Sequence, residues 1–301
     1  MTGFKFVVGT LVRLKRLCVI LLVCIFTVST AATGAPANNP VATPRFNPPK
    51  QYYLGLGDSL AFGFQFVKFF ANLPSEPPSI FSTGYVDDLT AKLQVIRPDI
   101  GTIDFGCPGE TTFTFIQGGC TYTAAGFQLH DSYTGPQLSA ALAFLHAHPG
   151  QVSPITINIG INDVNALRTL CGADPACYSE REPAVLRQIA ANLTYILGQL
   201  RAAAPDAEII TFTNYDVAFL LDPRLLEVTV AFNDVVVSTA KASSVRVADV
   251  FGAFNNAPQP ETICTLTFVC TPLQDAHPTD LVYRVIAQQI WVASDYDRIE
   301  P

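Results

Sequence analysis

Residues 52–63 read Tyr-Tyr-Leu-Gly-Leu-Gly-Asp-Ser-Leu-Ala-Phe-Gly. The apolar residues 52–56 are typical of a buried β-strand, which Gly57-Asp58-Ser59 ends abruptly. Small residues and a glycine follow, as in a short loop that leads into a helix. Such a junction places Ser59 at the carboxyl edge of a sheet with its hydroxyl exposed, where ligands of open parallel sheets bind. The same tripeptide also occurs in ordinary capping turns, so a catalytic interpretation requires partner residues elsewhere in the chain.

Strand-like and helix-like segments alternate along the rest of the chain. We predict strands at residues 52–56, 100–105, 154–159, 208–213 and 245–250. We predict helices at residues 84–94, 137–148, 183–204, 224–240 and 278–292, the last with Pro278 at its favoured first position. This alternation predicts an α/β fold, a single three-layer α/β/α domain in which helices cover both faces of a five-stranded parallel sheet.

The first 35 residues have the features of a secretory signal peptide. A positive flank precedes the apolar run 17–28, and small residues follow as far as Ala35. An uncleaved membrane anchor formed by residues 17–35 is the alternative, because this stretch is nearly long enough to span a bilayer. Residues 36–50 are rich in proline and read as an extended linker, which leaves residues 51–295 for the folded domain.

The composition limits the kind of partner. Hydrophobic residues make up 49% of the chain and charged residues 14%, which favours a large core over disorder. The leader holds four basic residues and no acidic one, so the remainder carries 14 basic against 25 acidic residues, a net charge of −11. This charge argues against binding to nucleic acid or to an anionic membrane. We expect a secreted, extracellular monomer with no stable membrane partner beyond the leader.

Six of the eight cysteines lie outside the leader and fall into three local pairs. The pairs are Cys107 and Cys120, Cys171 and Cys177, and Cys264 and Cys270. An even number in an exported chain indicates disulfides, although six cysteines allow fifteen pairings. We expect nearest-neighbour pairing, because each pair encloses a short, loop-like segment. The spacings do not fit a zinc site and no histidine lies among them, so we expect no metal.

Polar residues follow four of the five predicted strands. These blocks are Gly-Asp-Ser at 57–59 after the first strand, Gly-Cys-Pro-Gly-Glu-Thr-Thr at 106–112 after the second, Gly-Ile-Asn-Asp at 160–163 after the third and, past the last cysteine pair, Asp-Ala-His-Pro-Thr-Asp at 275–280 after the fifth. Because the carboxyl ends of parallel strands meet at one edge, a serine, two donor-rich loops and a histidine should converge there.

These four blocks, in this order, resemble the GDSL or SGNH hydrolase family, whose marker residues are Ser, Gly, Asn and His. The chain is most similar to the secreted bacterial esterase and lipase branch with three local disulfides, over about residues 52–292. The resemblance implies the flavodoxin-like SGNH-hydrolase fold and a catalytic domain at residues 51–295.

The resemblance also implies a role for each marker residue. Ser59 matches the nucleophile, and His277 matches the base that takes its proton. Ser59 and Gly109 match residues that supply backbone N–H groups to the oxyanion, and Asn162 matches the side-chain donor. Fixed neutral donors suit this chemistry, because an ester carbonyl develops negative charge on oxygen as it becomes tetrahedral.

Two positions depart from the family pattern. The family usually has an aspartate three residues before the histidine, where this chain has Gln274, while Asp275 stands two residues before it. Either Asp275 or a backbone carbonyl therefore orients His277. The second block usually begins with asparagine, and here that position is Asp104.

Other polar and aromatic residues have structural interpretations. His146 and His148 end a predicted helix, where they favour its dipole, and Asp58 and Asp163 are expected to brace their loops. The phenylalanines of residues 62–81 are expected in the core, with an acyl-binding wall or lid as the alternative.

We therefore predict a secreted serine esterase or lipase that hydrolyses carboxylic esters, with fatty-acyl or lipid esters preferred. The alternatives are a carbohydrate acetylesterase, an acyltransferase using the same residues, and a non-catalytic binding module. This chemistry needs no metal or organic cofactor. A dinucleotide site is disfavoured, because Leu60 stands where the third glycine of that pattern would be.

Overall fold

The computed structural model describes residues 46–73, 75–217, 220, 225–255 and 260–299, with only the backbone for residues 260–262. By internal contacts the chain divides into Met1–Pro40 and Val41–Pro301, and all described residues belong to the second unit. The predicted signal peptide at 1–35, the alternative anchor at 17–35 and most of the linker at 36–50 lie outside the described residues.

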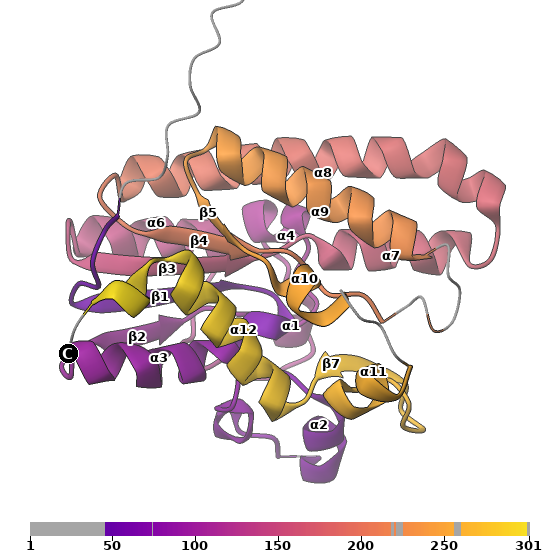
Figure 1. Ribbon diagram of the computed structural model, residues 1–301, viewed down its shortest axis with the longest axis horizontal. Helices are drawn as coiled ribbons and strands as arrows, with labels where there is room; N and C mark the ends of the chain where they lie inside the picture. The colour runs from indigo at the N-terminus through magenta and orange to yellow at the C-terminus, as the bar shows by residue number, and fades with distance from the viewer. Residues whose placement is uncertain (1–45, 74, 218–219, 221–224, 256–259, 300–301) are drawn as a thin grey trace, which may run out of the picture. The chain divides into compact units, whose positions relative to one another are not determined.

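A five-stranded parallel sheet forms the centre of this unit, in the order β2-β1-β3-β4-β5 (Figure 1). Its strands are β1 (Tyr52–Gly57), β2 (Gly101–Asp104), β3 (Val152–Asn158), β4 (Ile209–Phe212) and β5 (Arg246–Ala248). All four pairings are parallel, and each strand lies at or within about two residues of its predicted position. The predicted α/β fold with flavodoxin-like strand order is confirmed.

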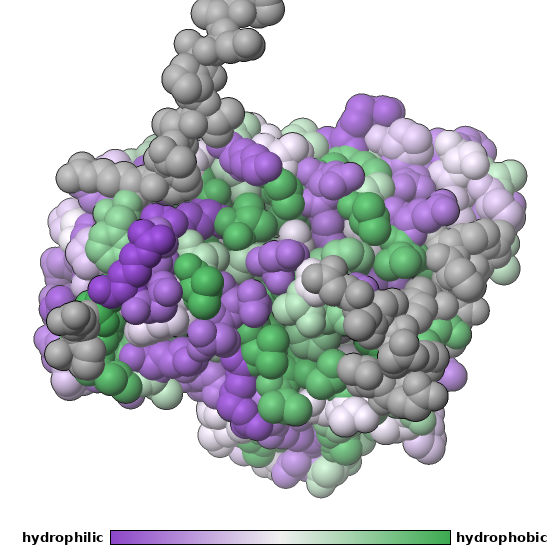
Figure 2. Space-filling model, in the orientation of Figure 1, coloured by the Kyte–Doolittle hydropathy of each residue, from purple (hydrophilic) through white to green (hydrophobic). Residues whose placement is uncertain are grey.

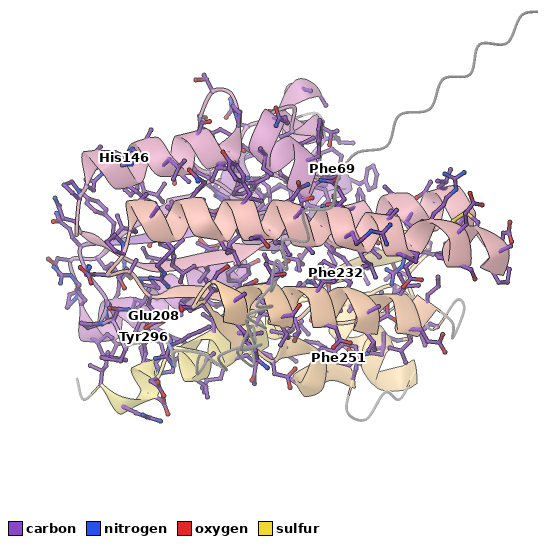
Figure 3. All side chains as sticks on the ribbon, turned by 90° about the horizontal axis from the view of Figure 1, so that it is seen from above. Phe69, His146, Glu208, Phe232, Phe251 and Tyr296 are labelled. Atoms are coloured by element: carbon purple, nitrogen blue, oxygen red, sulfur yellow. A yellow bond between two sulfur atoms is a disulfide. The ribbon has the colours of Figure 1, made fainter. Side chains whose placement is uncertain are left out.

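Helices cover both faces of the sheet, which makes three layers (Figure 1). One face carries α4 (Thr112–Gln117), α6 (Gln137–Ala147), α7 (Ile161–Cys171), α8 (Pro175–Ala203) and α9 (Leu225–Ala242). The other carries α3 (Tyr85–Ile96) and α12 (Asp280–Ala293). Figure 3, which views the first layer from above, shows α8 and α9 side by side with Phe232 at their boundary.

Alternation along β1 divides the hydrophobic core between these layers. Leu54 and Leu56 belong to the cluster that includes residues of α6, α8 and α9. Tyr53, which points to the opposite face, belongs to the cluster that includes residues of α3 and α12. Because β1 is buried on both sides and lies between β2 and β3, the loop that follows it starts from the interior of the sheet rather than from an edge strand.

Short elements at the carboxyl edge complete the unit. They are α1 (Ser59–Phe62), α2 (Phe66–Asn72), η1 (Pro78–Phe81), α5 (Thr121–Ala124), α10 (Val250–Asn255), α11 (Pro260–Leu266), β6 (Thr267–Phe268), β7 (Asp275–Pro278) and, at the opposite end of α12, η3 (Tyr296–Arg298). β6 and β7 form a separate antiparallel pair that the sequence analysis did not predict.

Two predicted helix starts are wrong. The last helix begins at Asp280 rather than Pro278, because Pro278 ends β7 and pairs with Thr267. The long helix α8 begins at Pro175 rather than Pro183, so Pro183 lies inside it. The true start has its own signals: the Asp174 side chain accepts a hydrogen bond from Ala176 N at 2.9 Å, and Pro175 takes the first position.

Three disulfides join Cys107 to Cys120, Cys171 to Cys177 and Cys264 to Cys270, which confirms the nearest-neighbour pairing. The expectation that each pair encloses a loop is correct only in part. Cys171 is the last residue of α7 and Cys177 lies in the first turn of α8, while Cys264 lies in α11.

Hydrophobic and hydrophilic side chains are mixed over the face of the molecule that Figure 2 shows. In the parts of the chain that the structure describes, no helix combines the length and the apolar character needed to cross a membrane.

Candidate active site

Ser59 is positioned by the end of β1. Gly57 has a φ of +133°, and a Cβ at this position would lie 2.1 Å from the backbone oxygen of Asn158, so only glycine fits. The Asp58 side chain then accepts a hydrogen bond from Leu60 N at 3.0 Å and caps α1. The strand therefore turns sharply into a helix, as predicted, with Ser59 as the first helical residue.

His277 and Asp275 meet Ser59 from β7. The Nε2 atom of His277 lies 2.9 Å from Ser59 Oγ, and its Nδ1 atom lies 2.5 Å from Asp275 Oδ1. An ionised carboxylate only accepts hydrogen bonds, so Nδ1 carries the imidazole proton and Nε2 accepts from the serine hydroxyl. The structure thus brings together a serine and a histidine that are 218 positions apart in the sequence.

Asp275 is held in its ionised form by its surroundings. Its exposed fraction is 1%, and burial raises its pKa. The hydrogen bonds and charge of His277, together with the 2.8 Å bond from Phe66 N to Oδ2, outweigh that effect, so the pKa lies below its usual range. Of the two predicted partners of His277, the described contact is with Asp275 rather than with a backbone carbonyl.

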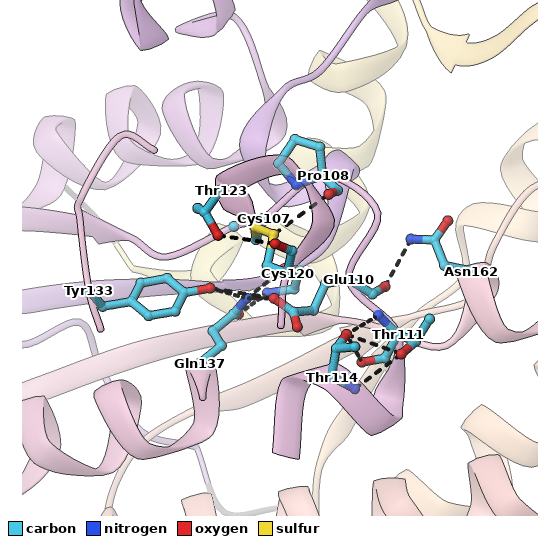
Figure 4. The surroundings of a disulfide bond; sticks show 12 residues. Cys107, Pro108, Glu110, Thr111, Thr114, Cys120, Thr123, Tyr133, Gln137 and Asn162 are labelled. Atoms are coloured by element: carbon cyan, nitrogen blue, oxygen red, sulfur yellow. Dashed lines mark hydrogen bonds between the residues drawn. A yellow bond between two sulfur atoms is a disulfide. The ribbon is translucent and has the colours of Figure 1, made fainter. Parts of the chain in front are cut away.

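Gly109 and Asn162 line the same cavity as Ser59. Gly109 has a φ of +83°, and a Cβ there would lie 2.6 Å from Thr121 Oγ1. The Asn162 amide nitrogen donates to the backbone oxygen of Glu110 at 2.9 Å, as Figure 4 shows. That bond uses one of the two N–H groups of the amide and holds it beside the loop that contains Gly109.

Asp163 and Gln137 brace these loops. Asp163 accepts hydrogen bonds at 2.8 Å from both the backbone nitrogen and the hydroxyl of Thr112, which confirms its predicted bracing role. Gln137, the first residue of α6, clamps Gly57 by accepting from its N–H at 2.7 Å and donating to its oxygen at 2.9 Å. Figure 4 shows Tyr133 and Gln137 converging on the Glu110 carboxylate. Sequence reasoning missed Gln137, because nothing local marks a glutamine at a helix start.

The carboxyl group of Asp58 is fully buried, and its Oδ2 has no hydrogen-bond partner among the described residues. Burial raises its pKa to about 7, and the nearby carboxylates of Glu110 and Asp163 add to the shift. Asp58 thus caps α1 and braces the loop, as predicted, in a setting that favours its neutral form.

The site opens into a cavity of about 890 Å³ with two kinds of lining. Aromatic rings line one part, namely Phe64, Phe66, Phe69, Tyr122 and Phe127. Phe64 and Phe66 contact the His277 ring edge-on, with centroids 5.1 and 5.6 Å away. The phenylalanine-rich segment therefore lies partly in the core and partly at the cavity, because Phe62 and Phe81 belong to a buried cluster and Phe64, Phe66 and Phe69 line the cavity.

Polar side chains line another part of the cavity and include residues of the loop after β4, which the sequence analysis did not consider. They are Asn162, Asn165, Arg168, Asn214 and Asp216. In that loop, Tyr215 OH donates to Ala276 O at 2.8 Å and so contacts the strand that carries His277. A signal was present in the polar sequence Asn-Tyr-Asp directly after the predicted fourth strand.

Two of the three remaining histidines contact backbone oxygens, and the third, His146, lies in the last turn of α6. His130 Nε2 lies 3.1 Å from Phe62 O and His148 Nδ1 lies 3.0 Å from Phe144 O, while Figure 3 shows His146 on α6. Cys107, Glu110 and Cys120 lie close enough to hold an ion, but the two sulfurs are joined in a disulfide and are not thiolates.

A serine hydroxyl hydrogen-bonded to a histidine that is oriented by a carboxylate is the arrangement of serine hydrolases. The sequence model of the GDSL-like lipase/acylhydrolase family matches residues 56–285, and the chain belongs to this family. It is a carboxylic ester hydrolase of the GDSL/SGNH type.

Solved structures share the fold at low sequence identity. An acetylxylan esterase from Geobacillus stearothermophilus is 17% identical with a TM-score of 0.54, covering 85% of this chain and 99% of its own. A GDSL-like lipase from Parabacteroides merdae, assigned as such without proof, is 15% identical with a TM-score of 0.56, covering 84% and 99%. No curated protein matches the chain.

Proposed function

We propose that this enzyme hydrolyses fatty-acyl or lipid esters through an acyl-enzyme on Ser59, with His277 as general base and Asp275 as its orienting partner. The observation that carries the proposal is the continuous contact from Asp275 through His277 to Ser59, at 2.5 and 2.9 Å, inside a cavity with an aromatic wall.

In the first half of the reaction, Ser59 Oγ forms a bond to the ester carbonyl carbon as its proton passes to His277 Nε2. The bond from carbon to the alcohol oxygen then breaks, and His277 returns the proton to the leaving alcohol. In the second half, water gives a proton to His277 Nε2 as its oxygen bonds to the acyl carbon. The bond from that carbon to Ser59 Oγ then breaks, His277 returns the proton to Ser59, and the acid is released. Asp275 stabilises the imidazolium in both halves.

Three donors are available for the oxyanion. They are the backbone N–H groups of Ser59 and Gly109 and the N–H of Asn162 that does not bind Glu110. Because the Asn162 amide and the Gly109 loop are already fixed by hydrogen bonds, they would stabilise the developing charge without reorganising.

The aromatic lining supports an acyl group longer than acetyl. A cavity of about 890 Å³ is much larger than an acetyl group needs, and ligand cavities typically measure about 300–1,000 Å³. The polar part of the lining supports the second candidate, a carbohydrate acetylesterase, which is also the activity in the name of the Geobacillus structure. Acyl transfer would use the same residues with an alcohol in place of water.

A series of p-nitrophenyl esters from acetyl to dodecanoyl tests the proposal, because the leaving group stays constant while the acyl chain grows. We expect kcat/KM to rise beyond acetyl, and Ser59→Ala to lose at least about 10⁴-fold in kcat on every ester. A maximum at acetyl would favour the acetylesterase. Equal rates for the enzyme and Ser59→Ala would contradict catalysis by this serine.

The disulfides support secretion, since such bonds persist in oxidising compartments. We infer that the leader is removed on export. N-terminal sequencing of the extracellular protein tests this inference, and a start near residues 33–36 is the expected result. A mature protein that retains residues 17–35 in the membrane fraction would support the anchor instead.

A further inference from the structure

The loop after β4 brings the side chain of Asn214 to the cavity. Contacts within the described part of the protein do not explain the position of this side chain. Asn214 lines the cavity together with Ser59 and His277, and its exposed fraction is 2%. Neither its Oδ1 nor its Nδ2 has a hydrogen-bond partner among the described residues. Burying an amide without partners is unfavourable, so such a group beside a ligand cavity points to a polar group on the ligand.

The backbone of Asn214 is held in place. The Asn233 side chain on α9 accepts from Asn214 N and donates to Asn214 O, both at 2.8 Å. The next residue, Tyr215, donates to Ala276 O and links this loop to the strand of His277. The Asn214 amide is therefore presented from a fixed backbone, as a recognition group must be.

Other polar residues of the lining already have partners. Arg168 Nη2 donates to Asp216 Oδ1 at 3.2 Å, to Leu225 O at 3.2 Å and to Thr229 Oγ1 at 2.6 Å. Asn165 Oδ1 accepts from Arg168 Nη1 at 3.3 Å. Asn214 differs from these residues because both its donor and its acceptor are uncommitted within the described part of the chain.

We propose that Asn214 recognises a hydroxyl group on the alcohol part of the substrate, so that the preferred leaving group is a polyol rather than a plain alkyl alcohol. A primary amide offers an acceptor and two donors, and a hydroxyl can donate to the first and accept from the second. An anionic group would satisfy only Nδ2 and would face the Oδ1 dipole. The aromatic wall then takes the acyl chain. This inference rests on the proposed ester hydrolysis at Ser59.

Two substrate pairs test it, each with a constant acyl group. The first pair is glycerol monobutyrate and propyl butyrate, and the second is a methyl xyloside monoacetate and cyclohexyl acetate. We expect kcat/KM to favour the polyol ester by about 10-fold in at least one pair, since an alkyl group would cover the Asn214 amide without bonding to it. The pair that shows the preference identifies glycerol or sugar as the polyol.

Asn214→Ala should bring that ratio close to 1, whereas Asn165→Ala, a matched change at an asparagine that already has a partner, should keep it. Asn214→Asp, which is nearly the same size but has no N–H donors, should also reduce the ratio and serves if the alanine variant does not fold. The inference is overturned if the native enzyme shows no preference in either pair, if the preference survives both Asn214 changes, or if Asn165→Ala abolishes it equally. In those cases hydrolysis of p-nitrophenyl butyrate by the native enzyme, and its loss in Ser59→Ala, would leave the proposed function standing.

Discussion

Ser59 and His277 are supported by parts of the molecule that differ in size. Ser59 follows β1, an inner strand of the five-stranded sheet whose side chains enter both main hydrophobic clusters. His277 lies on β7, whose pairing partner among the described residues is the two-residue strand β6. Ile263 of α11 and Val269, which follows β6, form a small buried cluster with Val217. The Cys264–Cys270 disulfide lies in this smaller region.

This difference teaches that the two halves of the site should fail in different ways. A change on the Ser59 side disturbs the main sheet and should affect global stability. A change on the His277 side should disturb the histidine first, because β7 pairs with a two-residue strand rather than with the main sheet.

The largest expected effect is on the Ser59 side. Gly57→Ala would place a methyl group 2.1 Å from Asn158 O at a φ of +133°, so the backbone of β1 or β3 must move. We expect a loss of at least about 3 kcal/mol in the free energy of unfolding, or no folded protein. Denaturant unfolding measures this loss. A stable Gly57→Ala protein would show that the end of β1 is less constrained than described.

The next effect is on the His277 side and concerns activity. Asp275→Asn removes the charge that orients and stabilises the imidazole, and we expect kcat to fall by about 10²–10⁴-fold. The global unfolding midpoint should change far less than in Gly57→Ala, and the circular dichroism spectrum should stay native. Near-full activity in Asp275→Asn would mean that another group orients His277.

The pH dependence of stability should also distinguish the two sides, because the pKa of Asp58 is raised and the pKa of Asp275 is lowered. The raised pKa of Asp58, about 7, means that its contribution to stability is present below its unfolded value near 4 and is lost as pH rises to 7. The lowered pKa of Asp275 means that its contribution is present above about 4 and is lost as pH falls further.

Asp58→Asn removes the first dependence. As pH rises from 5 to 8, the unfolding free energy of this variant should therefore increase by on the order of 2 kcal/mol relative to that of the native protein. As pH rises from 3 to 6, the native protein should instead gain stability that Asp275→Asn does not gain, so the variant falls behind it. Urea titrations at these pH values measure both differences, and equal pH profiles for the native protein and Asp58→Asn would refute the account of Asp58.

The Ser59 side was also the more predictable from sequence. Glycine, aspartate and serine directly after an apolar strand indicate a sharp turn into a helix. The loops that contain Gly109 and Asn162 likewise follow predicted strands directly. The alternation of elements predicted the parallel sheet and its two helical layers, and the family resemblance implied the flavodoxin-like strand order. On the other side of the site, His277 was assigned through its place in the four blocks that resemble the family, because no predicted strand directly precedes it.

What could not be predicted depends on contacts between distant residues. β6 and β7 are too short to show alternation, and α7 follows the third block without a cap of its own, since its Gly160 N-cap makes no side-chain hydrogen bond. Asn214 becomes informative only once Asn233 and the cavity are seen beside it. Pro183 and Pro278 each led to a wrong helix start. The sequence does not distinguish a proline at the first position of a helix from one inside a helix, as at Pro183, or at the end of a strand, as at Pro278.

The smallest expected effect gives the sharpest comparison, because the chain supplies two disulfides with the same sequence separation of 6. Opening either loop should remove a similar chain-entropy contribution, about 2 kcal/mol. Cys264→Ser with Cys270→Ser loosens the His277 side, so activity should be lost on heating several degrees before the global unfolding transition.

Cys171→Ser with Cys177→Ser instead loosens the junction of α7 and α8 in the main helical layer. In that variant, activity and global structure should be lost together at a lowered Tm. Residual activity after brief heating and far-ultraviolet circular dichroism, recorded on the same samples, measure the two transitions. If the two transitions coincide in both variants, the His277 side unfolds with the main sheet, and the small region is as cooperative with the core as the strand that carries Ser59.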